Sequence, residues 1–142
     1  MKVITIAGYH NSGKTILVEQ LARKLLEKGY RVGYVKHDPK DHGVTDKENS
    51  DTHRLFKILP KVALSSPLKL TLWEKRDDDP LKLLKEYFSD CDVVLLEGYK
   101  SYKNIPKIVL GNLEAQEVLL RIDKTVDIDH IIKVIEEMEE NL

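Results

Sequence analysis

The strongest constraint on this chain is an eight-residue stretch near its start, Gly8-Tyr9-His10-Asn11-Ser12-Gly13-Lys14-Thr15. It matches the pattern G-x-x-x-x-G-K-[ST] at every specified position, and this pattern is typical of loops that wrap around nucleotide phosphates. Residues 3–7 form a short apolar run before it, and apolar residues recur at helical spacing over residues 15–27. The pattern therefore lies between a predicted strand and a predicted helix, which is the context it requires.

Each fixed position of this loop has a chemical role in phosphate binding. Glycine at positions 8 and 13 lets the backbone approach an anion closely, so that successive N–H groups point at it. Lys14 places a positive charge at the β- and γ-phosphates, and the Thr15 hydroxyl is a hard oxygen ligand for Mg²⁺. The sequence therefore predicts a site for a nucleoside triphosphate with Mg²⁺, with contacts from Gly8, His10, Asn11, Ser12, Gly13, Lys14, Thr15 and Ile16.

Such a site also needs an acidic residue near the metal, and the apolar run 91–96 ends in one, Glu97. We predict that this run is the central strand of the sheet, because continuously apolar strands are buried on both faces. Glu97 can then bind Mg²⁺ through water or orient the attacking water, which makes Glu97 and Lys14 catalytic candidates. Asp92 begins the same strand, about 15 Å away by strand rise, and is excluded from the site.

The rest of the chain predicts an α/β fold in which strands alternate with helices. Residues 31–36 form a second strand, parallel to the first after a right-handed crossover. There follow a polar loop at 37–50, a short helix to about residue 58, two short strands at 61–64 and 68–73 in a hairpin or a meander, a helix from Pro80, weaker strands at 107–110 and 118–122, and a helix at 127–140. The inner side of the Pro80 helix is predicted to be Leu81, Leu84, Tyr87 and Phe88. We expect a three-layer P-loop NTPase-like fold with a mostly parallel central sheet, helices on both faces, and a single nucleotide-binding domain over residues 1–142.

Composition limits the partners of this chain. Charged residues make up 33% of it and its net charge is -1, so no overall field favours nucleic acid or membranes. The single cysteine, Cys91, cannot form an intrachain disulfide, and no apolar stretch approaches the ~20 residues of a membrane span. These observations favour a soluble cytoplasmic protein that binds neither nucleic acid nor membrane.

Three further motifs follow the phosphate loop in a distinctive order. They are Lys36-His37 after the second strand, Asp51-Thr52-His53-Arg54 after the polar loop, and Glu97-Gly98-Tyr99-Lys100 followed by Pro106-Lys107-Ile108. With these motifs the chain resembles the molybdopterin-guanine dinucleotide biosynthesis protein B family, MobB, from residue 1 to about residue 110. The resemblance implies GTP binding, weak GTPase activity and a homodimer. It also implies that the protein assists the guanylyltransferase (MobA-like) that attaches GMP to molybdopterin, with molybdopterin as a further ligand.

The resemblance assigns roles outside the phosphate loop. It implies that Asp46, on the family's loop motif, is a further metal ligand. Arg54 lies on the same motif, and its planar guanidinium makes it a catalytic candidate. The resemblance also implies that five residues contact the cofactor or a partner: Lys36, His37, Asp51, Thr52 and Lys100. The chain departs from the family motif at 49–50, where Asn-Ser replaces Gly-Lys, and at 58–60, where Ile-Leu-Pro lies in the region of a small Ala-Gly-Ala segment.

Two of these assignments leave alternatives open. Arg54 can neutralise transition-state charge in cis or across a dimer, or it can form a surface ion pair with a neighbouring acid. Lys100 belongs to a basic and aromatic segment, 99–103, that can hold a pterin or a partner, or can simply be solvated.

Other functions fit the fold but lack their usual residues. The main alternative is a P-loop small-molecule kinase that uses ATP, but such kinases carry an arginine-rich lid, and Arg54, Arg76 and Arg121 are scattered here. A metal-delivery GTPase of the nickel-insertion type uses Cys and His ligand pairs, which one cysteine does not supply, and the histidines of the polar loop lack metal-site spacing. No Asn-Lys-x-Asp tetrad for guanine is present, so the expected preference for GTP follows from the resemblance alone.

Overall fold

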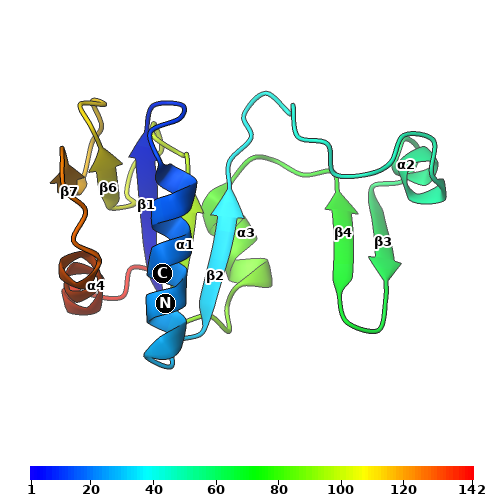
Figure 1. Ribbon diagram of the computed structural model, residues 1–142. Coiled ribbons are helices and arrows are strands. Elements are labelled where there is room, and N and C mark those ends of the chain that lie inside the picture. Colours follow the sequence, from blue (N-terminus) through cyan, green and yellow to red (C-terminus); the bar gives the residue numbers. More distant parts are fainter. The chain divides into compact units, whose positions relative to one another are not determined.

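The computed structural model describes all 142 residues, and they form two compact units. The core unit contains Met1–Pro39 and Pro80–Leu142, and the insert unit contains Lys40–Asp79. Figure 1 shows the elements of both units along the chain. A single nucleotide-binding domain over residues 1–142 stays a prediction.

The core unit is built on a five-stranded parallel sheet in the order β2-β5-β1-β6-β7. The strands are β1 (Lys2–Gly8), β2 (Val32–Lys36), β5 (Val93–Glu97), β6 (Lys107–Leu110) and β7 (Val118–Ile122). All five residues of β5 are buried, as its apolar run predicts, but β1 is the middle strand and β5 lies beside it. The prediction that β5 is central is wrong on this point, because both strands have neighbours on two sides and an apolar run does not tell them apart.

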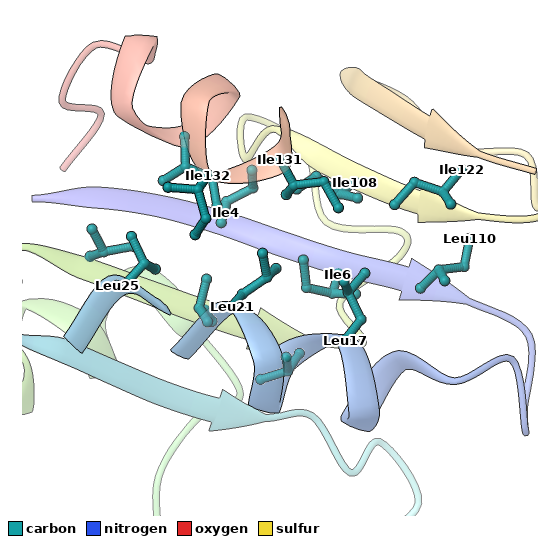
Figure 2. Close-up of a cluster of buried hydrophobic side chains, with 14 residues drawn as sticks. Ile4, Ile6, Leu17, Leu21, Leu25, Ile108, Leu110, Ile122, Ile131 and Ile132 are labelled. Atoms are coloured by element: carbon teal, nitrogen blue, oxygen red, sulfur yellow. The ribbon is translucent and has the colours of Figure 1, made fainter. Parts of the chain in front are cut away.

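One face of the sheet is covered by α1 (Lys14–Glu27) and α4 (Ile128–Glu137). Alternate side chains of a strand point to the same face, so Ile4 and Ile6 of β1 both meet this layer. Figure 2 shows these two isoleucines among the leucines of α1 and the isoleucines of α4. The helical spacing read from the sequence therefore marks the buried sides of both helices, which consist of Leu17, Val18, Leu21, Leu25, Ile131, Ile132 and Ile135.

The opposite face is covered by α3 (Pro80–Tyr87), which completes the predicted three-layer α/β fold. Leu84 of this helix is fully buried against Val94 and Leu96 of β5, and Leu81 and Phe88 pack at the margin. Tyr87 is 38% exposed, so the prediction that it lies on the inner side is wrong. Leu81, Leu84 and Phe88, spaced by three and four residues, follow one side of the helix, and Tyr87 is turned about 100° from Phe88 around the helix axis.

The insert unit contains α2 (Asp51–Phe56) and an antiparallel pair of strands, β3 (Lys61–Ser65) and β4 (Leu70–Glu74). The Ser50 hydroxyl caps α2 by accepting a hydrogen bond from the His53 N–H. The predicted pair of strands is a hairpin. None of the residues of α2, β3 or β4 is fully buried. In neither unit does a helix combine the length and the apolar composition needed to cross a bilayer.

Candidate nucleotide site

The phosphate loop joins the end of β1 to the start of α1, as the sequence predicts. Gly13 precedes the helix with a left-handed φ of 88°, a conformation that favours glycine. No side chain caps the first turn of α1, so its N–H groups face the loop and suit an anion. At Gly8, a Cβ atom would lie 2.6 Å from the Ser12 Oγ atom and 3.2 Å from the Leu110 carbonyl oxygen, so a side chain there would crowd the loop.

The Lys14 side chain folds back over this loop. Its Nζ atom donates hydrogen bonds to the carbonyl oxygens of Gly8 at 3.1 Å and Tyr9 at 2.7 Å. The ammonium group is thereby held beside the N–H groups of the same loop. A phosphate at this point would meet a fixed positive charge together with backbone donors.

The acid predicted for the site lies beside the phosphate loop. Glu97 ends β5 and pairs in register with Ile6 of β1, so its side chain starts at the same edge of the sheet. The Thr15 hydroxyl lies 3.0 and 3.2 Å from the two carboxylate oxygens of Glu97, a residue that is only 5% exposed. A hydroxyl and a carboxylate in contact are the hard oxygen donors that Mg²⁺ prefers, and the donor set therefore fits this metal.

A tyrosine that the sequence did not single out completes the arrangement. The Tyr34 hydroxyl of β2 donates a 2.6 Å hydrogen bond to the second oxygen of Glu97. Burial and this hydrogen bond raise the pKa of Tyr34 well above its ordinary value, so it remains a donor at neutral pH. β2 and β5 pair so that Lys36 lies opposite Glu97. Tyr34, two residues before Lys36, is therefore the diagonal neighbour of Glu97 on the same face of the sheet. The only signal in the sequence is a tyrosine two residues before Lys36, and it acquires meaning only when that register is known.

The phosphate loop, Lys36 and Glu97 surround a cavity of about 430 Å³. This volume lies within the range of ligand pockets in proteins. The lining brings together most of the predicted nucleotide contacts with the acid and the lysine from neighbouring strands: His10, Asn11, Ser12, Gly13, Lys14, Thr15, Ile16, Lys36 and Glu97. No arginine contributes to the lining.

The predicted motif at 97–100 begins with the acid that lines this cavity and leads into a turn in which the Tyr102 N–H donates to the Tyr99 carbonyl at 2.9 Å. The His37 ring stacks on the Tyr99 ring, with centroids 4.1 Å apart and an angle of 14° between their planes. Gly98, the residue before Tyr99, has a φ of 97°. A Cβ atom at Gly98 would lie 3.0 Å from the His37 Cβ. His37 does not line the cavity itself, and Lys100 lines a different pocket.

Four predicted site residues, Asp46, Asp51, Thr52 and Arg54, belong to the insert unit. The carboxylate of Asp46 accepts hydrogen bonds from the Thr52 hydroxyl at 2.7 Å and the Ser50 hydroxyl at 3.2 Å. The hydrogen bond from Thr52 lowers the pKa of Asp46. Within its unit Asp46 therefore anchors the start of α2, and its role as a metal ligand stays a prediction, as does the role of Arg54.

Asp92, excluded from the site on distance, lies at the other end of β5. Its carboxylate accepts hydrogen bonds from the Arg31 guanidinium at 2.8 Å and from the Arg31 backbone N–H at 2.8 Å. These bonds hold the pKa of Asp92 at about 2. Asp92 is therefore a surface ion-pair partner of Arg31, the residue before β2.

A family model and several relatives of this chain carry the same kind of description. A family model described as molybdopterin guanine dinucleotide synthesis protein B, MobB, matches residues 3–137. A molybdopterin-guanine dinucleotide biosynthesis adapter protein of Haemophilus influenzae is 34% identical, over 87% of this chain and 71% of that protein. A Methanocaldococcus jannaschii protein whose name proposes the same role is 33% identical, over 96% of this chain. The chain spans 62% of the length of this second relative.

A solved structure agrees with the architecture. A crystal structure of molybdopterin-guanine biosynthesis protein B superposes with a TM-score of 0.71, covering 94% of this chain and 97% of the other. Sequence identity over this superposition is 23%, so the likeness bears on the fold alone.

Proposed function

Because this chain belongs to the MobB family, we propose that it is an adapter of molybdopterin guanine dinucleotide biosynthesis that binds GTP with Mg²⁺ and hydrolyses it slowly. In this role it assists the guanylyltransferase (MobA-like) that joins GMP to molybdopterin. The reducing cytoplasm suits its free thiol, Cys91, and is where we place this activity.

One observation carries the nucleotide part of this proposal: the contact between the Thr15 hydroxyl and the Glu97 carboxylate beside the phosphate loop. Thr15 and Glu97 would hold Mg²⁺ directly or through water, and the metal would neutralise charge on the phosphates. Lys14 and the backbone N–H groups would bind the phosphate oxygens. Glu97 can also orient the water that attacks the γ-phosphate.

The composition of the cavity supports slow hydrolysis. Its lysines are Lys14 and Lys36, and no arginine lines it. An arginine that reaches the γ-phosphate accelerates GTP hydrolysis by about 10³ to 10⁵. Fast turnover by this chain would therefore need an arginine from elsewhere, for which Arg54 of the insert unit or a residue of the partner enzyme is the candidate.

Calorimetric titration of the purified protein with GTP, ATP and their non-hydrolysable analogues tests this function. We expect Mg²⁺-dependent binding with a clear preference for GTP, and loss of that binding in Lys14→Ala. Lys85→Ala, which removes an exposed lysine of α3, serves as the charge-matched control. A preference for ATP together with phosphate transfer to a small acceptor would contradict the adapter function and support the small-molecule kinase instead.

The homodimer is a separate part of the proposal, and the insert unit supports it. A two-stranded hairpin alone is at best marginally stable in water. Here the hairpin and its flanks leave large apolar side chains exposed, among them Leu64 at 52%, Leu70 at 68% and Ile58 at 75%. Apolar surface of this kind marks association sites, and we propose a second copy of the chain as the partner.

Sedimentation equilibrium of the full chain tests this dimer. We expect a dimer for the wild-type chain, and a monomer when Leu64→Lys and Leu70→Lys are combined, because two charges would have to be buried in the interface. Leu26→Lys, at an exposed apolar position of α1, should remain a dimer. A wild-type monomer would remove the dimer from the proposal without affecting the nucleotide site.

A further inference from the structure

The core unit contains a second pocket, of about 400 Å³, that shares no lining residue with the nucleotide cavity. It lies between the two segments that join parallel strands without a helix, residues 98–106 from β5 to β6 and residues 111–117 from β6 to β7. We call it the crossover pocket. Tyr102 and Ala115, one from each segment, pack against the clusters on the sheet face opposite α1.

Each of the two segments that line the crossover pocket is held by hydrogen bonds from a cationic side chain. Lys107 of β6 has no exposed surface, and its Nζ atom donates hydrogen bonds to the carbonyls of Tyr102 at 2.6 Å and Ile105 at 2.9 Å. The Arg121 guanidinium donates to the carbonyls of Gly111 at 2.6 Å and Leu113 at 3.0 Å. Loops held by charge-assisted hydrogen bonds lose little freedom when a ligand arrives, which favours binding.

The lining of the pocket combines three kinds of recognition chemistry. Two ammonium groups, Lys100 and Lys103, are suited to a phosphate ester. The Tyr102 ring offers an aromatic surface for a planar heterocycle. The Glu114 carboxylate can accept two adjacent N–H donors, and Gln116 can both donate and accept hydrogen bonds.

We propose that the crossover pocket binds a pterin that carries a phosphate ester. The 2-amino-4-oxo edge of a pterin presents a ring N–H and an amino group side by side, the donor pair that one carboxylate accepts. Lys100 and Lys103 would bind the phosphate, and Tyr102 would contact the ring. The inference rests on the proposed function, because the pterin is the acceptor of the nucleotide in that pathway.

The nucleotide cavity and the crossover pocket are separate sites on the chain. The nucleotide cavity draws on the phosphate loop, β2 and β5, whereas the crossover pocket draws only on the two connecting segments. Nucleotide and pterin can therefore occupy one chain at the same time. An adapter with this arrangement would deliver both reactants to its partner enzyme.

Binding of 6-hydroxymethylpterin monophosphate, followed by pterin fluorescence, tests the proposal. We expect saturable binding that persists with saturating GTP and in Lys14→Ala. Glu114→Gln should weaken it about tenfold, since it replaces a charged acceptor by an amide that also presents donors. Lys100→Ala combined with Lys103→Ala should weaken binding about tenfold as well, and should leave the affinity for unphosphorylated 6-hydroxymethylpterin unchanged.

The same titrations include a control variant and distinguish the results that would contradict pterin binding. Lys85→Ala combined with Lys133→Ala removes two exposed lysines outside the pocket and should leave pterin binding unchanged. Inorganic phosphate binding as tightly as the pterin ester, displacement of the probe by GTP, or equal affinity in wild type and Glu114→Gln would each overturn the proposal. GTP binding without pterin binding would refute only the crossover pocket, whereas pterin binding without GTP binding would refute the proposed nucleotide function.

Discussion

The Thr15 hydroxyl lies 3.0 Å from the Glu97 carboxylate, although 82 residues separate the two in the chain. The contact forms because β1 and β5 are neighbours in parallel register, which brings the start of α1 and the end of β5 to one edge of the sheet. In parallel α/β sheets, ligands bind beyond the carboxyl ends of the strands. The nucleotide and its metal are therefore expected at this edge.

Glu97→Gln keeps the size of the side chain and removes its charge. At saturating Mg²⁺ we expect GTP to bind with nearly unchanged affinity, because Lys14 and the phosphate loop remain, and hydrolysis to slow at least about tenfold, because an amide does not activate water. Single-turnover hydrolysis beside equilibrium binding separates the two effects. Asp92→Asn, at the other end of β5, should leave both unchanged, and normal hydrolysis in Glu97→Gln would remove Glu97 from the catalytic residues.

Tyr34→Phe tests the hydrogen bond that restrains Glu97. Loss of a group that orients a metal ligand typically lowers metal affinity about 10- to 100-fold. We therefore expect the Mg²⁺ concentration for half-maximal hydrolysis to rise by about tenfold, with little change in thermal stability. Tyr30→Phe removes a hydroxyl that donates to Glu136 at 3.2 Å, outside the cavity, and should leave the Mg²⁺ dependence as it is. A Tyr34→Phe protein with wild-type Mg²⁺ dependence would show that the hydrogen bond has no positioning role.

Thr5→Val concerns the core behind the phosphate loop. Thr5 is fully buried on β1, and its hydroxyl oxygen has no hydrogen-bond partner. Valine has nearly the same shape and no polar group to desolvate, so the free energy of unfolding should rise by about 1 kcal/mol. Urea unfolding measures this change. Thr52→Val is the matched comparison, because it removes a hydroxyl that donates to Asp46 and should lower stability.

Acid unfolding should report the ion pair between Arg31 and Asp92. The pKa of Asp92 falls from 3.8 to about 2 in the folded chain, so the unfolded chain binds more protons between these values. Its contribution to stability is therefore complete above pH 3.8 and is lost as the pH falls through about 2. Asp92→Asn should lower stability at pH 6 and match the wild type near pH 2, as measured by urea unfolding across this range. Asp129→Asn, whose exposed carboxylate lies 3.5 Å from Lys24, should show a smaller difference.

Local patterns in the sequence determined most of the elements and most of the residues that line the nucleotide cavity. The apolar run before Gly8 and the helical spacing after Thr15 identify a strand, a loop and a helix that the structure confirms. The acid that ends the apolar run at 91–96 is also identified, because the end of a buried parallel strand is where such sites gather their side chains. These features depend on neighbours within a few residues, which the sequence displays directly.

The contacts that depend on strand order and register were decided only by the tertiary structure. Tyr34 reaches Glu97 because β2 pairs with β5, and a shift of one residue would turn that tyrosine to the other face. The middle position of β1 and the carbonyl contacts of Lys107 and Arg121 likewise follow from which strands are neighbours. Pairing between distant strands is stabilised by the packing of the whole core, and no short stretch of sequence carries that information.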